Sequence, residues 1–195
     1  MTFSSVKTGE VGLSFALNNN FMEPIGTTLV GAGGVNQVTF NDIPQTYKHL
    51  QIRGIARSTK NADGRGALYL QLNSDNAVNY SSHNLIGDGA SVSAGFVTTQ
   101  PYMLGVSFML PSATATANAF GGFILDILDY ANTSKYKTVR NLIGSDFNST
   151  TPLPGRIGLE SSSWRNTDAV TSIKFYTDSG NWAQHSRFSL YGIKG

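Results

Sequence analysis

From residue 27 onward, apolar and polar side chains alternate with a period of two over several short stretches of the sequence. Leu50, Ile52, Gly54 and Ala56 alternate with polar or basic residues, and residues 68–73 repeat this alternation. A period of two is expected where one face of a β-strand is buried and the other faces solvent. The alternation therefore predicts strands in which every second side chain points into a core.

Further apolar runs follow, and most of them are bounded by residues that favour turns. The runs cover residues 102–110, 120–128, 139–143, 156–159, 170–176 and 188–193. Asn, Asp, Gly and Ser lie between them, as in residues 60–64 and 178–181, and these residue types accept turn conformations or bond to their own backbone. About nine or ten short strands at fairly regular spacing predict an all-β fold, a sandwich or a barrel.

The segment Ile124–Tyr130 is the one place where apolar spacing also fits a helix. It has no capping residue, and it follows the pair Gly121 and Gly122. Short apolar runs are ambiguous between a strand and a buried helix, and the flanking residues decide between them. We therefore expect a buried strand here.

Residues 1–25 differ from the rest of the chain because no period runs through them and they contain loop-forming residues such as Asn18–Asn20 and Pro24. We predict an irregular N-terminal arm over residues 1–25, followed by a single β-sandwich domain over residues 26–195. The apolar side chains of the arm are candidate anchors for a partner protein: Phe3, Val6, Val11, Leu13, Phe15 and Phe21. The alternative is that they complete the core of the sandwich, since a terminal strand often ties down the end of a chain.

The composition points to a surface built from uncharged polar residues. Charged residues make up only 13% of the chain and hydrophobic residues 40%, so polarity is carried mainly by Ser, Thr, Asn, Gln and Gly. Such surfaces suit proteins in permanent contact with other proteins or with sugars. The net charge of +2 is spread without a basic patch, which argues against a nucleic-acid partner.

The sequence also lacks the features of a secreted or membrane-bound protein. It has no cysteine, so disulfides and thiolate chemistry are excluded. No apolar stretch approaches the roughly 20 residues that a membrane span needs, and the first residues do not form a signal peptide. We therefore expect synthesis in a cytoplasm and no membrane partner.

Asp126 and Asp129 come nearest to a catalytic pair, because two carboxylates can provide acid–base catalysis in a glycosidase. On a strand, however, residues three apart point to opposite faces. We expect one of them to cap the strand end and to pair with a basic residue nearby, namely Lys135, Lys137 or Arg140.

Neither a metal site nor a cofactor site is predicted. His49, His83 and His185 have no partner His or Cys at metal-ligand spacing. The glycine-rich segment Val30–Gly34 is followed by a strand pattern, whereas a dinucleotide site needs a helix there. We therefore expect no catalytic, metal or cofactor-binding residues and no enzymatic activity.

Three aromatic residues are candidates for contact with carbohydrate or with another subunit: Tyr102, Trp164 and Trp182. Both tryptophans lie in polar surroundings, and an exposed indole can stack on a sugar ring or anchor an interface. The interpretation favoured for the tryptophans is packing over the end of the core or within an interface between subunits.

Several stretches of the sequence resemble a family of phage virion proteins and phage tail or fibre modules. They are Phe40–Gly54, Asn79–His83, Gly87–Val92, Ile127–Arg140 and Arg187–Lys194, and the resemblance covers residues 27–195. It implies a jelly-roll-like antiparallel β-sandwich, displayed as a homotrimer on the virion surface, and it implies no catalytic residue.

We therefore expect a bacteriophage virion structural protein made in the cytoplasm of a bacterial host. The first placement is a capsid decoration (cement) protein that binds the major capsid protein of the assembled head as an oligomer. The alternative is a tail or tail-fibre module that contacts tail proteins and host surface carbohydrate. A depolymerase enzyme, which would depend on a carboxylate such as Asp126, is the third hypothesis.

Overall fold

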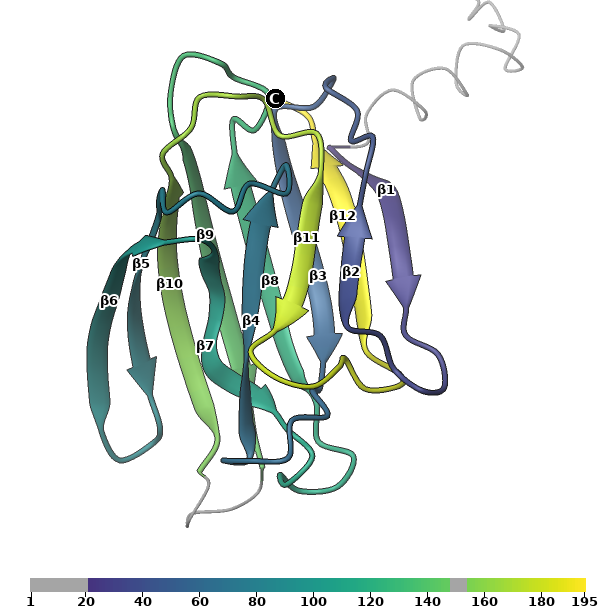
Figure 1. Cartoon of the computed structure of the whole chain (residues 1–195), viewed down its shortest axis with the longest axis vertical. Coiled ribbons are helices and arrows are strands. Elements are labelled where there is room, and N and C mark those ends of the chain that lie inside the picture. Colours follow the sequence, from purple (N-terminus) through teal and green to yellow (C-terminus); the bar gives the residue numbers. More distant parts are fainter. Residues whose placement is uncertain (1–20, 148–153) are drawn as a thin grey trace, which may run out of the picture.

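The computed structural model describes residues 21–147 and 154–195, which form two antiparallel sheets stacked as a sandwich (Figure 1). The larger sheet contains, from edge to edge, β1 (Met22–Leu29), β12 (Arg187–Ile193), β3 (His49–Ala56), β8 (Gly121–Leu128), β9 (Lys137–Ser145), β10 (Arg156–Trp164), β5 (Tyr80–Gly87) and β6 (Val92–Gln100). The smaller sheet contains β2 (Gln37–Phe40), β11 (Ile173–Thr177), β4 (Arg65–Leu72) and β7 (Met103–Pro111). No helix in this part of the chain could cross a membrane.

The strand order is that of a jelly roll with four additional strands. The smaller sheet has the order β2-β11-β4-β7, and the first four strands of the larger sheet have the order β1-β12-β3-β8. Together these eight strands form the two interlocking Greek keys of a jelly roll. The strands β9, β10, β5 and β6 extend the larger sheet beyond β8. The predicted all-β, jelly-roll-like sandwich is therefore confirmed.

The core lies between the two sheets, where the predicted alternation places its apolar side chains. On β3, Leu50, Ile52 and Ala56 are fully buried, and on β4 so are Leu70 and Leu72. Fully burying one of these leucine or isoleucine side chains stabilises the fold by about 1.5–3 kcal/mol. The segment that fitted a helix is strand β8, so the expectation of a strand is confirmed there.

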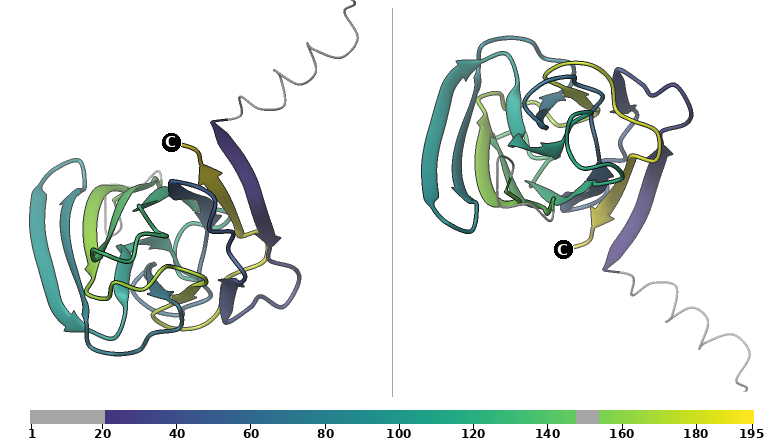
Figure 2. Two further views of the ribbon diagram at one scale, coloured as in Figure 1. Left: turned by 90° about the horizontal axis from the view of Figure 1, so that it is seen from above. Right: turned by 90° about the horizontal axis from the view of Figure 1, so that it is seen from below.

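The larger sheet is wider than the smaller one, and its last strand is left uncovered. The edge strand β7 of the smaller sheet packs against β9, β10 and β5. Figure 2 shows the hairpin of β5 and β6 beside β10, at the side of the sandwich. Strand β6 has no buried residue over its nine positions. It is therefore accessible on both of its faces.

The first strand begins inside the predicted arm. Met22–Leu29 forms β1, which pairs with β12 from the partners Met22 and Ile193 onward. Met22, Glu23 and Pro24 of the predicted arm therefore lie opposite residues of the last strand of the sandwich. Residues 1–20 lie outside the described residues.

Candidate functional site

The outward side of the larger sheet carries large apolar side chains, although it faces solvent. On β9 and β10 every second side chain is buried between the sheets. The side chains between them, Leu142 on β9 and Leu159 on β10, point outward and are 47% and 55% exposed. Single exposed apolar residues are normal on protein surfaces, but here they are continuous from strand to strand. We call the whole set the apolar outer face, and it consists of Ile55, Leu85, Val92, Phe96, Ile124, Leu142, Ile157 and Leu159.

The register of the strands aligns these side chains in rows. Ile124 pairs with Leu142, Leu142 with Leu159, and Leu159 with Leu85. Side chains directly opposite each other on neighbouring antiparallel strands lie about 5 Å apart and contact one another. One unbroken apolar row therefore crosses β8, β9, β10 and β5.

The neighbouring row alternates large apolar residues with glycines. It runs from Ile55 on β3 to Val92 on β6 through Gly122, Gly144, Ile157 and Gly87. Glycine has no side chain, so the sheet surface is lower at these points. This second row crosses six strands from β3 to β6, or roughly 24 Å at the usual strand spacing.

Two shallow hollows lie on the apolar outer face. One has a volume of about 660 Å³ and is lined mainly by residues of β5, β8, β9 and β10, including Leu85, Ile124, Leu142 and Leu159. The other has a volume of about 460 Å³ and includes Gly122, Gly144 and Ile157. Apolar lining of this kind receives an apolar protein surface rather than a charged ligand.

One border of the face is charged. Arg140 and Asp126 are cross-strand partners, and Nη2 of Arg140 lies 3.7 Å from Oδ2 of Asp126. The other carboxylate oxygen of Asp126 accepts a hydrogen bond from Nε2 of Gln51 at 2.9 Å. An apolar centre with a polar border is the usual anatomy of a protein–protein interface.

On the inward side of the larger sheet, a group of buried polar side chains lies next to β7. Nδ2 of Asn141 donates to Oε2 of Glu160 at 2.8 Å, and both residues are buried. Oγ of Ser162 donates to Oγ of Ser82 at 2.7 Å, and Ser82 also accepts a hydrogen bond from the backbone N–H of Leu104. Buried polar groups are retained when they are hydrogen-bonded. These contacts join β5, β9 and β10 to β7.

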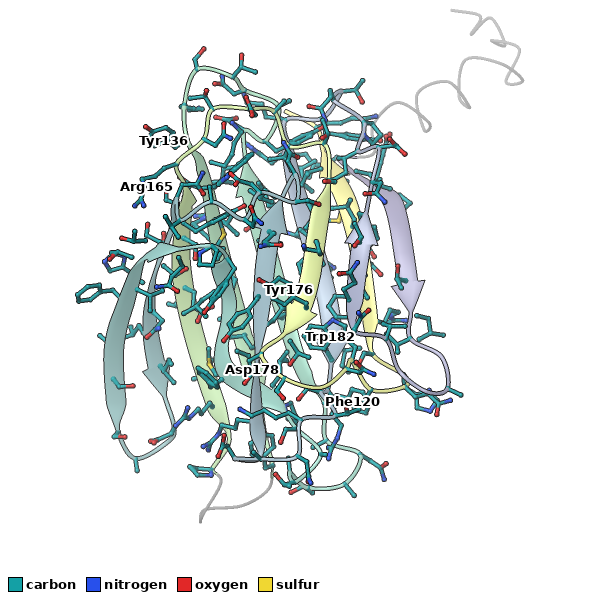
Figure 3. The ribbon with its side chains drawn as sticks, viewed as in Figure 1. Phe120, Tyr136, Arg165, Tyr176, Asp178 and Trp182 are labelled. Atoms are coloured by element: carbon teal, nitrogen blue, oxygen red, sulfur yellow. The ribbon has the colours of Figure 1, made fainter. Side chains whose placement is uncertain are left out.

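A second surface feature is a tyrosine cluster, which consists of Tyr69, Tyr102 and Tyr176 on the outward side of the smaller sheet. The rings of Tyr69 and Tyr102 are stacked with their centroids 4.1 Å apart, and the ring of Tyr176 meets Tyr69 edge-on at 5.5 Å. Figure 3 shows Tyr176 on β11, on the side turned away from the larger sheet. Burial, with Tyr102 beside it, raises the pKa of Tyr176 to about 12, and burial also raises the pKa of Tyr69. All three rings are half-buried.

The two tryptophans singled out from the sequence are in the core. Trp164 and Trp182 are both 0% exposed. Nε1 of Trp164 donates to Oδ2 of Asp75 at 2.7 Å, and Nε1 of Trp182 donates to the backbone carbonyl of Phe175 at 3.4 Å. A ring without accessible surface cannot stack on a sugar, so the contact with carbohydrate proposed for these two residues does not occur. Both tryptophans instead pack in the core, which is the interpretation favoured from the sequence.

The other predicted contact residues are divided between the surface and the undescribed segment. Tyr102 is part of the tyrosine cluster, and Phe21 is 68% exposed immediately before β1. The remaining proposed anchors of the arm, Phe3, Val6, Val11, Leu13 and Phe15, lie outside the described residues.

Asp126 and Asp129 form ion pairs with different basic residues, and only Asp126 lies on the strand. Asp126 pairs with Arg140 on the sheet surface. Asp129 follows the end of β8 and forms ion pairs with Lys135 and, at 3.3 Å, with Lys48. The predicted pairing with basic residues is confirmed. Within residues 21–147 and 154–195, no group of three His, Asp or Glu residues could hold a metal ion.

The apolar outer face was not predicted. The sequence signal for it is the occurrence of apolar residues at successive positions, as at Ile124–Leu125 and Leu142–Ile143. For Ile124–Tyr130 such a run predicts a buried strand. The structure buries only one member of each pair fully, which leaves the other on the surface.

Comparisons with known proteins give no family for this chain. No protein-family model matches the sequence, and no curated protein does. Among solved structures, the chain has a similarity to a candidate pore-forming toxin from Bacteroides vulgatus, with 10% sequence identity and a TM-score of 0.10. The match covers 84% of this chain and 57% of that chain, so it spans little more than half of the other protein. A TM-score at this level carries no argument about fold or function.

Proposed function

We propose that this chain is a non-enzymatic structural protein of a bacteriophage particle, and that it acts as a decoration (cement) protein on the assembled head. The observation that carries the proposal is the apolar outer face, in which Ile124, Leu142, Leu159 and Leu85 form an unbroken row across four strands. Soluble monomers seldom expose continuous apolar patches of this extent, and such patches mark sites of association with other proteins. The phage assignment itself rests on the resemblance of the sequence to virion proteins.

The carboxylates near the face support a structural role, because they are engaged in contacts that hold the sheet together. Asp126 is paired with Arg140 and accepts a hydrogen bond from Gln51. Glu160 is buried and accepts a hydrogen bond from Asn141. Acid–base catalysis needs a carboxylate that can reach a substrate in a cleft.

A cement protein works by many weak contacts that are repeated by the symmetry of the shell. A protein that binds only the assembled shell stabilises it by mass action, by about 2.7 kcal/mol at a hundredfold excess over the dissociation constant. A broad apolar surface suits this task, because its contribution scales with the area removed from water.

The placement is tested by electron microscopy of intact virions labelled with an antibody to this chain. Label over the head is the expected result. Label over the tail would instead support the alternative placement, and an unlabelled particle would exclude a structural role in the virion.

The role of the apolar outer face is tested on purified heads with the variants Leu142→Lys and Leu159→Lys. Both side chains are about half exposed, so the fold is expected to remain while a charge is introduced into the interface. We expect at least a tenfold loss of binding to heads. Gln37→Lys is the matched control, because it places the same charge at an exposed position of the smaller sheet, opposite the uncharged Tyr176. Equal binding by all three variants would exclude this face as the contact.

A second candidate function, a tail or tail-fibre module that contacts host carbohydrate, is favoured by the tyrosine cluster. Stacked aromatic rings with partial exposure form a platform on which a sugar ring can pack. Tyr102→Ala removes the ring that stacks on Tyr69. Under this alternative the variant loses binding to host surface polysaccharide, whereas Leu159→Lys keeps it; under the decoration role neither variant changes polysaccharide binding.

A further inference from the structure

The larger sheet ends in an edge strand, β6, that has neither a charged residue nor a proline, and whose first six residues, Val92–Val97, contain no bulge. Natural proteins guard such edges with charged residues, proline, bulges or short strands. Among the four sheet edges of the described structure, β1 carries Glu23, Pro24 and a register shift, β2 is four residues long, and β7 has two register shifts. By contrast, β6 has nine residues without a charge or a proline.

The regular part of β6 is its first two-thirds. From Val92 to Val97 the strand pairs with β5 without interruption, and its one register shift comes after Val97, where Thr99 has a positive φ of 58°. A bulge at that end twists the strand and limits pairing there. The segment Val92–Val97 therefore remains straight and open along its free side.

The hydrogen bonds of the β5–β6 turn determine which backbone groups are free. The backbone N–H of Asp88 donates to the carbonyl of Ser91 across this turn. Hydrogen-bonded and non-hydrogen-bonded pairs alternate along an antiparallel ladder. The N–H and C=O groups of Ser93 and Gly95 therefore point toward β5, and those of Val92, Ala94 and Phe96 point away from the sheet.

The same three residues also carry the exposed side chains of β6. The register with β5 places Val92, Ala94 and Phe96 on the apolar outer face, opposite Gly87, Leu85 and His83. Val92 is 73% exposed and Phe96 is 69% exposed, more than any other large apolar residue in the described part of the chain. A partner strand on this edge would bury both side chains.

The sequence of the edge is complementary to itself in one antiparallel register. If Ala94 lies opposite Ala94 of a second copy, Val92 lies opposite Phe96 of that copy on both sides of the two-fold axis. All three pairs then join residues whose backbone groups point away from the sheet, so each pair exchanges two hydrogen bonds. The small alanine lies at the axis, where two copies of one side chain must meet.

We propose that two copies of this chain associate through β6, as antiparallel edge strands related by a two-fold axis at Ala94. A two-fold axis normal to the sheet keeps the outward side of both copies on one side. The apolar outer faces then form one surface across both copies, with the two Val92–Phe96 contacts at its centre. The resemblance implies a trimer, and the contacts within such a trimer would use a surface other than β6. The β6 edge would then link one trimer to a second.

The first test is the mass of the full chain in solution, measured by light scattering after size exclusion. We expect twice the chain mass of 20.9 kDa, or twice the mass of a trimer. Ala94→Lys places two lysines opposite each other at the axis, and like charges at such a position repel. We expect this variant, and likewise Ala94→Glu, to halve the mass.

Mixing the two variants makes the test independent of a folding defect. Lysine opposite glutamate is a favourable pair, so an equimolar mixture of Ala94→Lys and Ala94→Glu is expected to recover the doubled mass. Circular dichroism of each variant alone is expected to match that of the wild type, since Ala94 is exposed.

The register is tested with cysteines, which the natural sequence lacks entirely. Ala94→Cys is expected to give a covalent dimer with a short bis-maleimide, because opposite residues in a hydrogen-bonded antiparallel pair have Cα atoms about 5.5 Å apart. Gln37→Cys, an exposed position on the edge strand of the smaller sheet, is the control and is expected to remain uncrosslinked at the same concentration. Three outcomes would overturn the proposal: a wild type without the doubled mass at about 100 µM, a doubled mass that Ala94→Lys leaves unchanged, or equal crosslinking at both cysteines.

Discussion

The ring of Phe123 lies directly over Gly54, its cross-strand partner in the larger sheet. A Cβ atom at position 54 would be only 2.1 Å from Cζ of Phe123. On the other side of β3, Gly54 pairs with Phe188, whose ring centroid is 5.9 Å from that of Phe123. The ring of Phe123 therefore occupies the space that a side chain at position 54 would need. An aromatic ring packed over a strand glycine also compensates for the missing side chain.

We expect Gly54→Ala to destabilise the fold by about 1–3 kcal/mol, because overpacking forces a buried ring out of its position. Gly122→Ala is the matched control on the adjacent strand β8, since a Cβ there meets nothing within 4 Å. Chemical denaturation of both variants measures the difference. Equal free energies of unfolding would show that the contact between Phe123 and residue 54 has no energetic consequence.

Gly54 also illustrates what the sequence could predict. The alternation of Leu50, Ile52, Gly54 and Ala56 placed this glycine on the inward face of a strand, and the structure agrees. A period of two reports which side of a strand faces a core, so strands with one apolar side were predictable. The jelly-roll arrangement of those strands came from the resemblance, because periodicity says nothing about which strands are neighbours.

The alternation of apolar and polar residues could not predict the apolar outer face or the β5–β6 hairpin. In β8, apolar residues at successive positions such as Ile124 and Leu125 indicate two apolar sides, and sequence alone does not show that one of them is exposed. The hairpin was not predicted, since Ser81, Ser82 and Gly95 interrupt any apolar alternation. The position of the hairpin at the edge of the larger sheet, beside the apolar outer face, depends on the pairing of β5 with β10, which is distant in the sequence.

The polar setting of Trp164 in the sequence is explained by Asp75, which lies 89 positions earlier and accepts the hydrogen bond of its indole. Burial would raise the pKa of Asp75, but hydrogen bonds from Asn79, the backbone of Ala77 and Trp164 outweigh it, so this pKa is lowered from its ordinary value of 3.8. We expect Asp75→Ala to cost about 1–3 kcal/mol at neutral pH, since it leaves a buried donor unsatisfied.

The lowered pKa of Asp75 gives this cost a definite pH dependence. The stabilising contribution is present above the ordinary pKa of 3.8 and is lost as the pH falls through the lower pKa of the folded state. The difference in free energy of unfolding between wild type and Asp75→Ala is therefore expected to shrink below about pH 4. Denaturation at pH 7 and pH 3 measures it, and a difference independent of pH would contradict the role of the charge. In a double-mutant cycle, Asp75→Ala should destabilise the protein less when Trp164→Phe has already removed the indole N–H.

Lys137 is a fully buried cation whose partners are backbone carbonyls. Its Nζ donates to the carbonyls of Asn132 at 2.6 Å, Lys135 at 3.1 Å and Thr167 at 3.0 Å. It thereby joins the loop after β8 to the loop after β10. We expect Lys137→Met to destabilise the protein by about 3 kcal/mol, because buried acceptors lose their donor.

The neighbouring Lys135→Met is the control, since its side chain is half exposed and contacts Asp129 at the surface. Exposed ion pairs contribute little, so we expect a much smaller change in the thermal midpoint. Similar midpoints for both variants would mean that the carbonyls are satisfied without the ammonium group of Lys137.

The tyrosine cluster should govern the stability of the protein in alkali. The pKa of Tyr176 is raised to about 12, by burial first and by Tyr102 second, from an ordinary value of 10.0. A phenol whose pKa is higher in the folded state favours folding below its ordinary pKa, and this contribution is lost as the pH rises toward the folded value. The wild type is therefore expected to lose more stability between pH 10 and about 12 than Tyr176→Phe, which cannot ionise there. Ultraviolet titration of the wild type and of Tyr102→Phe tests the second cause, because removing the Tyr102 hydroxyl should lower the pKa of Tyr176 in part while the burial of its ring remains. A titration of Tyr176 at its ordinary pKa in the wild type would mean that the cluster is open to water in solution.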